Sequence, residues 1–239
     1  TTDGGYIVGG NSTSNDGDVF GNYGLIDIWV VKLDASGNIQ WQKNLGGTDY
    51  DEGYSIQQTT EGGYIIAGYT NSNDGNVSGN HGNYDFWILK LDASGSFQWQ
   101  KTLGGTADDR AESIQQTSDG GYIVVGYTYS NDGDVSGHHL DRDFWVVKLD
   151  ESGNIQWQKA LGGTGYEHAY SVQQTSDSGY IVAGMTYSND GDVSGNHGEV
   201  DFWVVKLDTS GSIQWQKTLG GTGSETAFSI QQKCESETC

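Results

Sequence analysis

The sequence repeats itself four times with a period of 58 residues and without a single insertion or deletion. The copies are residues 1–58, 59–116, 117–174 and 175–232, followed by a tail at 233–239. A phrase close to FWVVKLD ends at Asp34 in the first copy and at the equivalent residue of the others, and an LGGT run follows in every copy. Such a period is typical of architectures in which each unit buries its apolar face against its neighbours. Residues shared by all copies are therefore expected to build the unit, and those that differ are candidates for function.

Each copy is predicted to contain four short strands. In the second copy these are residues 54–58, 63–69, 85–91 and 96–103, which are rich in β-branched and aromatic residues and bounded by Gly, Asn, Asp and Ser. Two tight hairpins, at 59–63 and 92–96, place Gly where a short loop needs positive φ. The third strand is almost wholly apolar, as expected for a strand covered on both faces, and the fourth alternates, as expected for an outer strand. Four such strands describe a propeller blade.

The predicted fold is therefore an all-β propeller of four four-stranded antiparallel blades. The chain begins at the second strand of a blade and ends, at 228–232, with a first strand. Pairing of 228–232 with the strand near 5–10 would close the ring and remove its open edges. Two alternatives remain: an open repeat array, or a filament in which the terminal strand of one molecule completes the first blade of the next.

The charge of the chain restricts its partners. A net charge of −21 argues against nucleic-acid binding, which needs a basic surface, and against adhesion to anionic membranes. No segment approaches the roughly 20 apolar residues of a membrane span, so no membrane insertion is expected. The remaining candidate partners are a second copy of the chain, or a glycan or protein on a cell surface.

Two features favour an extracellular or cell-surface location. Cys234 and Cys239 are the two cysteines and could form a disulfide within the tail. Asn11 and Asn76 lie in N-glycosylation sequons, a triplet that also occurs by chance. A mature secreted chain would have lost its signal peptide, so the absence of one here is compatible with secretion.

The consensus phrases GGYIVAG, DFWVVKLD, SGNIQWQK and LGGT resemble the tandem propeller-type repeats of secreted bacterial surface proteins that are exported with a C-terminal sorting domain. The resemblance covers residues 1–232. It implies a propeller fold and a surface location, and it implies little about activity. The chain departs from that pattern because it has only four units and no sorting domain.

One end of the predicted blades carries the long loops and most of the variation between copies. Function concentrates on such loops when a rigid scaffold presents them, although drift at exposed sites produces the same pattern. The candidate residues of this binding face are Tyr50, Glu52, Tyr84, Asp108, Arg110, Arg142, Tyr166 and His168.

The long loops also share an acidic N-D-G-D phrase, which reads N-D-G-N in the second copy. Its carboxylates are Asp16, Asp18, Asp74, Asp132, Asp134, Asp190 and Asp192. Closely spaced Asp and Asn around a Gly are typical of Ca²⁺ loops, and they are equally typical of turns that Asp and Asn cap through their own backbone. Ca²⁺ is therefore a candidate ligand, and no cofactor is required.

No signature of catalysis is present: the chain has no G-x-S-x-G, no H-E-x-x-H, no P-loop and no dinucleotide fingerprint. The first functional hypothesis is a non-catalytic extracellular structural or adhesive module, alone or as the subunit of a surface fibre. The second is a lectin-like or protein-binding propeller that uses the long-loop face. A propeller glycoside hydrolase is a distant third.

Overall fold

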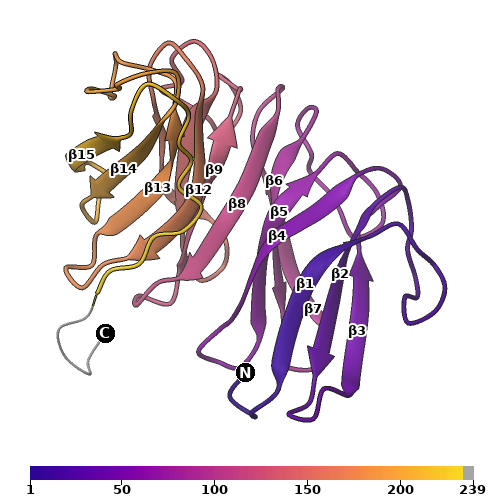
Figure 1. Ribbon diagram of the computed structural model, residues 1–239. Coiled ribbons are helices and arrows are strands. Elements are labelled where there is room, and N and C mark those ends of the chain that lie inside the picture. Colours follow the sequence, from indigo (N-terminus) through magenta and orange to yellow (C-terminus); the bar gives the residue numbers. More distant parts are fainter. Residues whose placement is uncertain (234–239) are drawn as a thin grey trace. The chain divides into compact units, whose positions relative to one another are not determined.

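The structure is a computed structural model that describes residues 1–233 (Figure 1). This part of the chain contains strands and no helix. The strands are β1 (Tyr6–Ser12), β2 (Asp27–Leu33), β3 (Ile39–Leu45), β4 (Asp51–Gln58), β5 (Tyr64–Thr70), β6 (Asp85–Leu91), β7 (Phe97–Leu103), β8 (Asp109–Gln116), β9 (Tyr122–Thr128), β10 (Asp143–Leu149), β11 (Ile155–Leu161), β12 (Glu167–Gln174), β13 (Tyr180–Thr186), β14 (Asp201–Leu207) and β15 (Ile213–Leu219).

These strands form four antiparallel sheets. Three sheets have four strands, in the orders β4-β5-β6-β7, β11-β10-β9-β8 and β12-β13-β14-β15, and the sheet β1-β2-β3 has three. The predicted all-β fold class with propeller-type blades is confirmed. Closure of the blades into a ring stays a prediction.

The local expectations within a blade also hold. In the second copy, β6 has the predicted bounds, β5 and β7 start one residue later than expected, and β4 starts three residues earlier. Every residue of β6 is buried, as its apolar sequence predicts. The hairpin glycines Gly62 and Gly95 have φ of 89° and 77°, which a residue with a side chain rarely adopts.

The chain divides after Gln116 into two compact units, each made of two repeats. In the first unit the core contains Ile28, Ile66 and Trp87, with Trp41 and Ile56 packed against it. In the second unit the core contains Phe144 on β10, Trp203 on β14 and apolar residues of the neighbouring strands, such as Ile123 on β9 and Val182 on β13. Each unit therefore buries apolar side chains from two successive repeats in one core.

Within a unit, a tryptophan of one repeat is covered by the next repeat. The rings of Trp41 and Tyr64 meet edge to face with their centroids 5.6 Å apart, and a Cβ at Gly95 would lie 2.9 Å from the Trp41 ring. The second unit repeats this contact with Trp157, Tyr180 and Gly211: the ring centroids are again 5.6 Å apart, and the added Cβ would lie 2.8 Å from the tryptophan. The tyrosine and the glycine of one repeat together form the seat for the tryptophan of the repeat before it.

The long loop of one repeat is fastened to the LGGT run of the preceding repeat. The backbone N and Oγ1 of Thr48 donate hydrogen bonds of 2.8 and 3.0 Å to the two carboxylate oxygens of Asp74. In the second unit Thr164 donates to Asp190 in the same way, with both bonds at 2.8 Å. The repeated threonine and aspartate therefore hold one repeat to the next.

A lysine lies inside the apolar third strand of each repeat. Lys90 is 3% exposed, and its ammonium reaches Glu61 Oε1 at 2.5 Å and Thr59 Oγ1 at 2.6 Å. Lys148 and Lys206 are also buried, and each pairs at 2.9 Å with an aspartate of the hairpin turn in its own repeat. The lysine ammonium is thus paired with a carboxylate at the end of the blade, while the aliphatic part of the side chain lies in the core.

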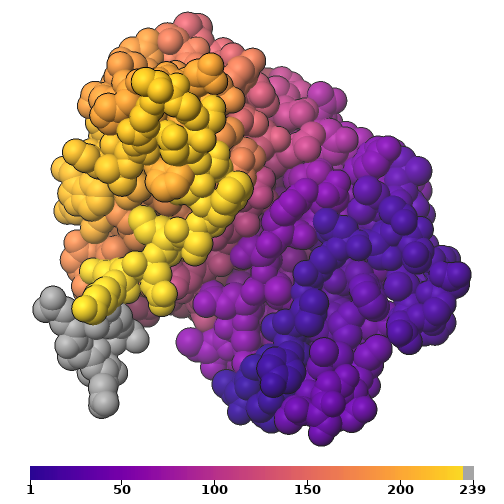
Figure 2. All heavy atoms as spheres, in the orientation of Figure 1, coloured from indigo at the N-terminus to yellow at the C-terminus, as the bar shows by residue number. Residues whose placement is uncertain are grey.

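The C-terminal segment lies where the first strand of a further blade would lie. In the first unit, Gln116 N on β8 donates to Gln57 Oε1 at 2.8 Å. In the second unit, Gln232 N donates to Gln173 Oε1 at 2.6 Å, and Figure 2 shows the yellow segment against the orange surface of its unit. Residues 228–232 form no strand, and the first sheet has three strands, so the pairing of 228–232 with 5–10 remains a prediction.

We expect the loop fastening to contribute to stability in a way that a matched pair of variants can isolate. Asp74→Ala removes both acceptors of Thr48, whereas Asp16→Ala changes the equivalent residue of the first loop, whose carboxylate has no hydrogen-bond partner among residues 1–233. Asp74→Ala should lower the melting temperature by roughly 2–4 °C and Asp16→Ala should leave it unchanged. Equal effects in thermal unfolding by circular dichroism would contradict the role of this contact.

Candidate binding surface

In the first unit the structure brings five of the predicted binding-face residues together. The guanidinium carbon of Arg110, on β8, lies 4.2 Å from the ring centroid of Tyr84 and 4.5 Å from that of Tyr69. Asp108 Oδ2 lies 3.3 Å from Arg110 Nη2. Tyr50 and Glu52 are close enough to Tyr84 to act on its phenol electrostatically. The arginine is thus held by a carboxylate and by two aromatic faces.

A β-bulge adds a further tyrosine to this group. The register of β4 against β5 shifts between Gly53 and Ser55, which leaves Tyr54 as the extra residue. Tyr54 stacks on Tyr69 at 5.7 Å, donates a 2.8 Å hydrogen bond to Glu52, and remains 48% exposed. We define the Tyr/Arg surface by the residues of this group, which are Tyr50, Glu52, Tyr54, Tyr69, Tyr84, Asp108 and Arg110.

Three tyrosines of the Tyr/Arg surface, Tyr54, Tyr69 and Tyr84, keep their protons. Burial raises the pKa of Tyr69, and its hydrogen bonds to Tyr54 and Glu52 raise it further. Burial also raises the pKa of Tyr54 and of Tyr84, although the Arg110 charge opposes the shift at Tyr84. These phenols are therefore hydrogen-bonding groups and not charges at physiological pH.

The second unit has an aromatic group at the equivalent positions, and it contains the other three predicted residues. The Arg142 guanidinium carbon lies 4.7 Å from the ring centroid of Tyr127 and 5.6 Å from that of Tyr166. His168 stacks on Tyr170 with 3.9 Å between centroids and meets Tyr127 edge to face at 4.6 Å. Both units therefore place an arginine and several aromatic rings at the same end of their sheets.

The tyrosines that complete both groups are not among the binding-face residues predicted from the sequence. Tyr54 and Tyr170 occupy one repeat position, which reads Glu112 in the second copy and Phe228 in the terminal segment. That variation between copies was a usable signal. Tyr69 was predicted only as the end of a strand, and nothing in the sequence pattern marks Tyr69 or Tyr127 as a contact of arginine.

The acidic phrases act as turns and fasteners in this structure. Asp74 and Asp190 bind threonine, and Asp192 Oδ2 accepts a 3.3 Å hydrogen bond from Gly162 N. Asn76 Oδ1 accepts the same bond from Gly46 N at 3.3 Å, so the amide of the second copy replaces the carboxylate without loss of this contact. Within residues 1–233, no three His, Cys, Asp or Glu side chains are grouped so that they could hold a metal ion.

A second set of carboxylates is completely buried. Asp27 and Asp51 are 0% exposed, and a Cβ at Gly46 would lie 2.5 Å from Asp27 Oδ1 and 2.8 Å from Asp51 Oδ2. The second unit repeats the arrangement with Asp143 and Glu167, whose oxygens both lie 2.3 Å from the Cβ position of Gly162. These repeated glycines are needed because two carboxylates press against the same carbon.

Burial is the main cause of the altered pKa values of these acids. It raises the pKa of Asp27, of Asp51, of Asp143 and of Glu167. Among residues 1–233, Asp27 Oδ1 has no hydrogen-bond partner, whereas Asp51 accepts from Gly47, Thr70 and Ser72.

The histidines of the long loops contact the carboxylates at the repeat position of Asp27, which are Asp85, Asp143 and Asp201. Nδ1 of His81, of His139 and of His197 lies 2.6–2.9 Å from the buried aspartate four residues later. Burial lowers the pKa of His139, but the Asp143 carboxylate outweighs burial, and the net shift is upward. These histidines thus hold the long loop to the start of the third strand of the blade.

The candidate modification residues have mixed positions. Asn11 is exposed, and its side chain accepts a 2.7 Å hydrogen bond from Gly53 N. Asn76 is half-buried in the contact with Gly46 described above. Glycosylation of either stays a prediction. Cys234 and Cys239 lie outside the described residues, so their disulfide also stays a prediction.

Comparison with known proteins leaves the family open. No family model matches the chain. A regulatory protein, FlaEY of Caulobacter vibrioides, is 29% identical over 143 residues, which are 53% of this chain and 14% of that protein. The WD40 domain of Neurospora crassa Pan2 aligns with a TM-score of 0.48 and 12% identity, over 85% of this chain and 51% of that domain.

An apocarotenoid oxygenase of Synechocystis aligns with a TM-score of 0.41 and 15% identity, over 80% of this chain and 46% of the enzyme. These structural scores are below 0.5, so the fold is argued from the sheets of the chain itself. No helix of the described residues is long and apolar enough to cross a membrane.

We expect Ca²⁺ to leave the melting temperature unchanged, because the threonine contacts already occupy the carboxylates of Asp74 and Asp190. Thermal unfolding in a chelator and in about 5 mM Ca²⁺ should coincide. A ligand that binds only the native state raises the melting temperature with its concentration. A rise with Ca²⁺ that is lost in the Asp18→Ala variant would instead assign calcium to these loops.

The buried carboxylates predict greater stability in mild acid. An acid whose pKa is raised by folding binds more protons in the native state, so the free energy of unfolding should increase as the pH falls from about 8 to about 5. The raised pKa of His139 acts in the same direction. Hydrogen bonds from Lys90 and Gln116 outweigh partial burial and lower the pKa of Glu61 to about 2. The stability that the ionised Glu61 contributes is therefore lost only in stronger acid.

Asp27→Asn tests this directly, because an amide in place of Oδ1 could donate to the neighbouring Asp51 carboxylate. We expect the variant to melt higher than the wild type near pH 8 and to show a shallower pH dependence. A pH dependence as steep as that of the wild type would exclude this pair as a cause.

Proposed function

We propose that the chain is a non-catalytic extracellular adhesive and structural module, alone or as a subunit of a surface fibre, that binds its partner through the Tyr/Arg surface. The observation that carries the proposal is the arrangement of Arg110 against two tyrosine rings, with Tyr50 and Tyr54 exposed beside it. Tyrosine and arginine are among the side chains most enriched at protein-binding hot spots, since they contribute a large contact area and directional hydrogen bonds.

Rigidity favours a binding role for this surface. Arg110 is held by Asp108 and by two rings, and Tyr54 is held by Glu52 and Tyr69. Side chains that are already ordered lose less conformational entropy when a partner binds. The repeat structure below them supplies a scaffold whose loops are fastened by threonine and aspartate.

The buried acids do not support the glycosidase alternative. A glycosidase needs two carboxylates on either side of an accessible glycosidic bond. The pairs Asp27 with Asp51 and Asp143 with Glu167 are 0% exposed and lie against the backbone of a glycine. Their geometry suits a structural role.

A lectin-like role is the second candidate, because exposed tyrosine rings also stack on sugar rings. Tyr54, at the bulge of β4, and Tyr166, which immediately precedes β12 in the second unit, each expose more than a third of their surface. The two candidates differ in the ligand and share the surface.

A glycan array and a cell-adhesion assay with fluorescently labelled protein test the proposal together. We expect binding in at least one assay, and Arg110→Ala and Tyr54→Ala should each weaken it by about tenfold. Tyr23→Ala is the matched control, because Tyr23 is 59% exposed and lies outside both aromatic groups. Binding that is insensitive to Arg110→Ala and Tyr54→Ala would refute this surface as the site.

A further inference from the structure

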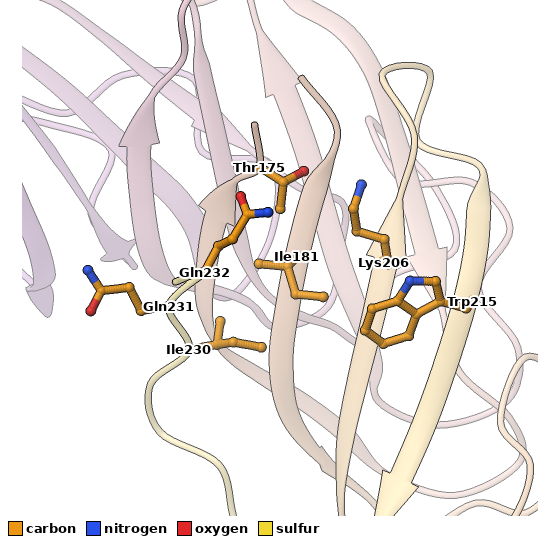
Figure 3. A pocket seen from close by; sticks show the side chains of 7 residues that line it. All are labelled: Thr175, Ile181, Lys206, Trp215, Ile230, Gln231 and Gln232. Carbon is orange, nitrogen blue, oxygen red and sulfur yellow. The ribbon is translucent and has the colours of Figure 1, made fainter. Parts of the chain in front are cut away.

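The second unit has a pocket between its last blade and the terminal segment. It has a volume of about 230 Å³ and is lined by Ile181, Lys206 and Trp215 of the last blade and by Ile230 and Gln232 of the terminal segment. Figure 3 shows Ile181 between Ile230 on one side and Trp215 with Lys206 on the other. This is smaller than the roughly 300–1,000 Å³ of a typical ligand pocket, and it suits a single side chain.

The repeat itself identifies that side chain. Shifting the lining residues back by one repeat gives Ile123, Trp157 and Val172, and these pack in one core with Tyr180. In the first unit the equivalent residues are Ile7, Trp41 and Ile56, which pack with Tyr64. At both places the same pocket is filled by the tyrosine that begins the second strand of the following repeat.

The polar rim of the pocket fits a phenol. Lys206 Nζ pairs with Asp177 Oδ2 at 2.9 Å, as Lys32 pairs with Asp3 at 2.8 Å in the first unit. The charges of Lys32 and Asp3 act on the phenol of Tyr64, which places its hydroxyl near that ion pair. A tyrosine in the last pocket would meet Lys206 and Asp177 in the same way.

The first repeat carries the matching surface. Tyr6, at the start of β1, is 57% exposed, whereas its counterparts Tyr64 and Tyr180 are 1% and 3% exposed. Gly37 is the counterpart of the glycines that seat Trp41 and Trp157, and a Cβ built there would meet nothing within 4 Å. On the other side of the contact, Trp215 is 49% exposed.

We propose that this pocket binds Tyr6 of a second copy of the chain, with Trp215 seated on Gly37 of that copy. The contact joins the last repeat of one molecule to the first repeat of the next and reproduces the contact between repeats within a unit. It is heterologous, so it builds an open fibre or a closed ring of several copies. This inference deepens the structural part of the proposed function, because it names the partner as the chain itself.

The acidity of the chain gives the association a distinct salt dependence. Two molecules of net charge −21 repel each other, and salt screens that repulsion. The pocket contact itself is mostly apolar. Association should therefore strengthen as NaCl is raised from about 20 mM to about 500 mM, in contrast to an assembly held by surface ion pairs.

Sedimentation velocity of the full chain over a range of concentrations tests the proposal. We expect the wild type to form species larger than a dimer, and Tyr6→Ala or Trp215→Ala to weaken association by at least about tenfold. Phe20→Ala is a matched control, because Phe20 is 65% exposed and lies outside both surfaces. A wild type that stays monomeric at all concentrations and salt levels, or single variants that associate like the wild type, would overturn it.

Mixing the two variants separates this contact from a loss of folding. Tyr6→Ala keeps the pocket and Trp215→Ala keeps the tyrosine, so an equimolar mixture should form a heterodimer and stop there. A mixture that stays monomeric would refute the pairing. If Trp215→Ala instead lowers the melting temperature of a monomer without any dependence on protein concentration, the partner is not a second copy. Arg110→Ala should associate like the wild type, which keeps this test independent of the Tyr/Arg surface.

Discussion

The structure depends on one constraint: a repeat cannot bury its large aromatic residues by itself. Trp41 is covered by a tyrosine and a glycine of the following repeat, and Trp157 is covered in the same way in the second unit. Aromatic rings of this size supply much of the apolar area in a chain with eight Trp and fourteen Tyr. Stability is therefore located at the contacts between repeats as much as within any sheet.

Polar groups add direction to these contacts. Thr48 donates to the Asp74 carboxylate from both its backbone N and its hydroxyl. These two hydrogen bonds together fix the position and orientation of the carboxylate. Asp27 and Asp51 meet over Gly46, where any larger residue would displace both carboxylates. Burying acids in this way costs free energy, and the cost is acceptable where hydrogen bonds from Gly47, Thr70 and Ser72 hold one of the two carboxylates in place.

Much of this could be predicted from the sequence, because strands and turns depend on residues that are close along the chain. The bounds of β6 and the positive φ of Gly62 and Gly95 follow from local pattern and turn chemistry. The burial of Lys90 did not follow, since its partner Glu61 lies in another hairpin and only the folded sheet brings them together. The exposure of Tyr54 was likewise missed, because a β-bulge turns it outward and the sequence around it reads as regular strand.

The loop fastening has a consequence for how such chains can grow. The threonine of the contact and its aspartate belong to successive repeats, and so do the tryptophan and its tyrosine. A duplicated segment of 58 residues therefore carries half of each contact at either end, wherever in the repeat the duplication begins. Unequal recombination can add or remove whole copies without breaking a junction, whereas a gain or loss of one residue would put every later contact out of step. The absence of insertions and deletions across four copies is what such a mode of descent would leave behind.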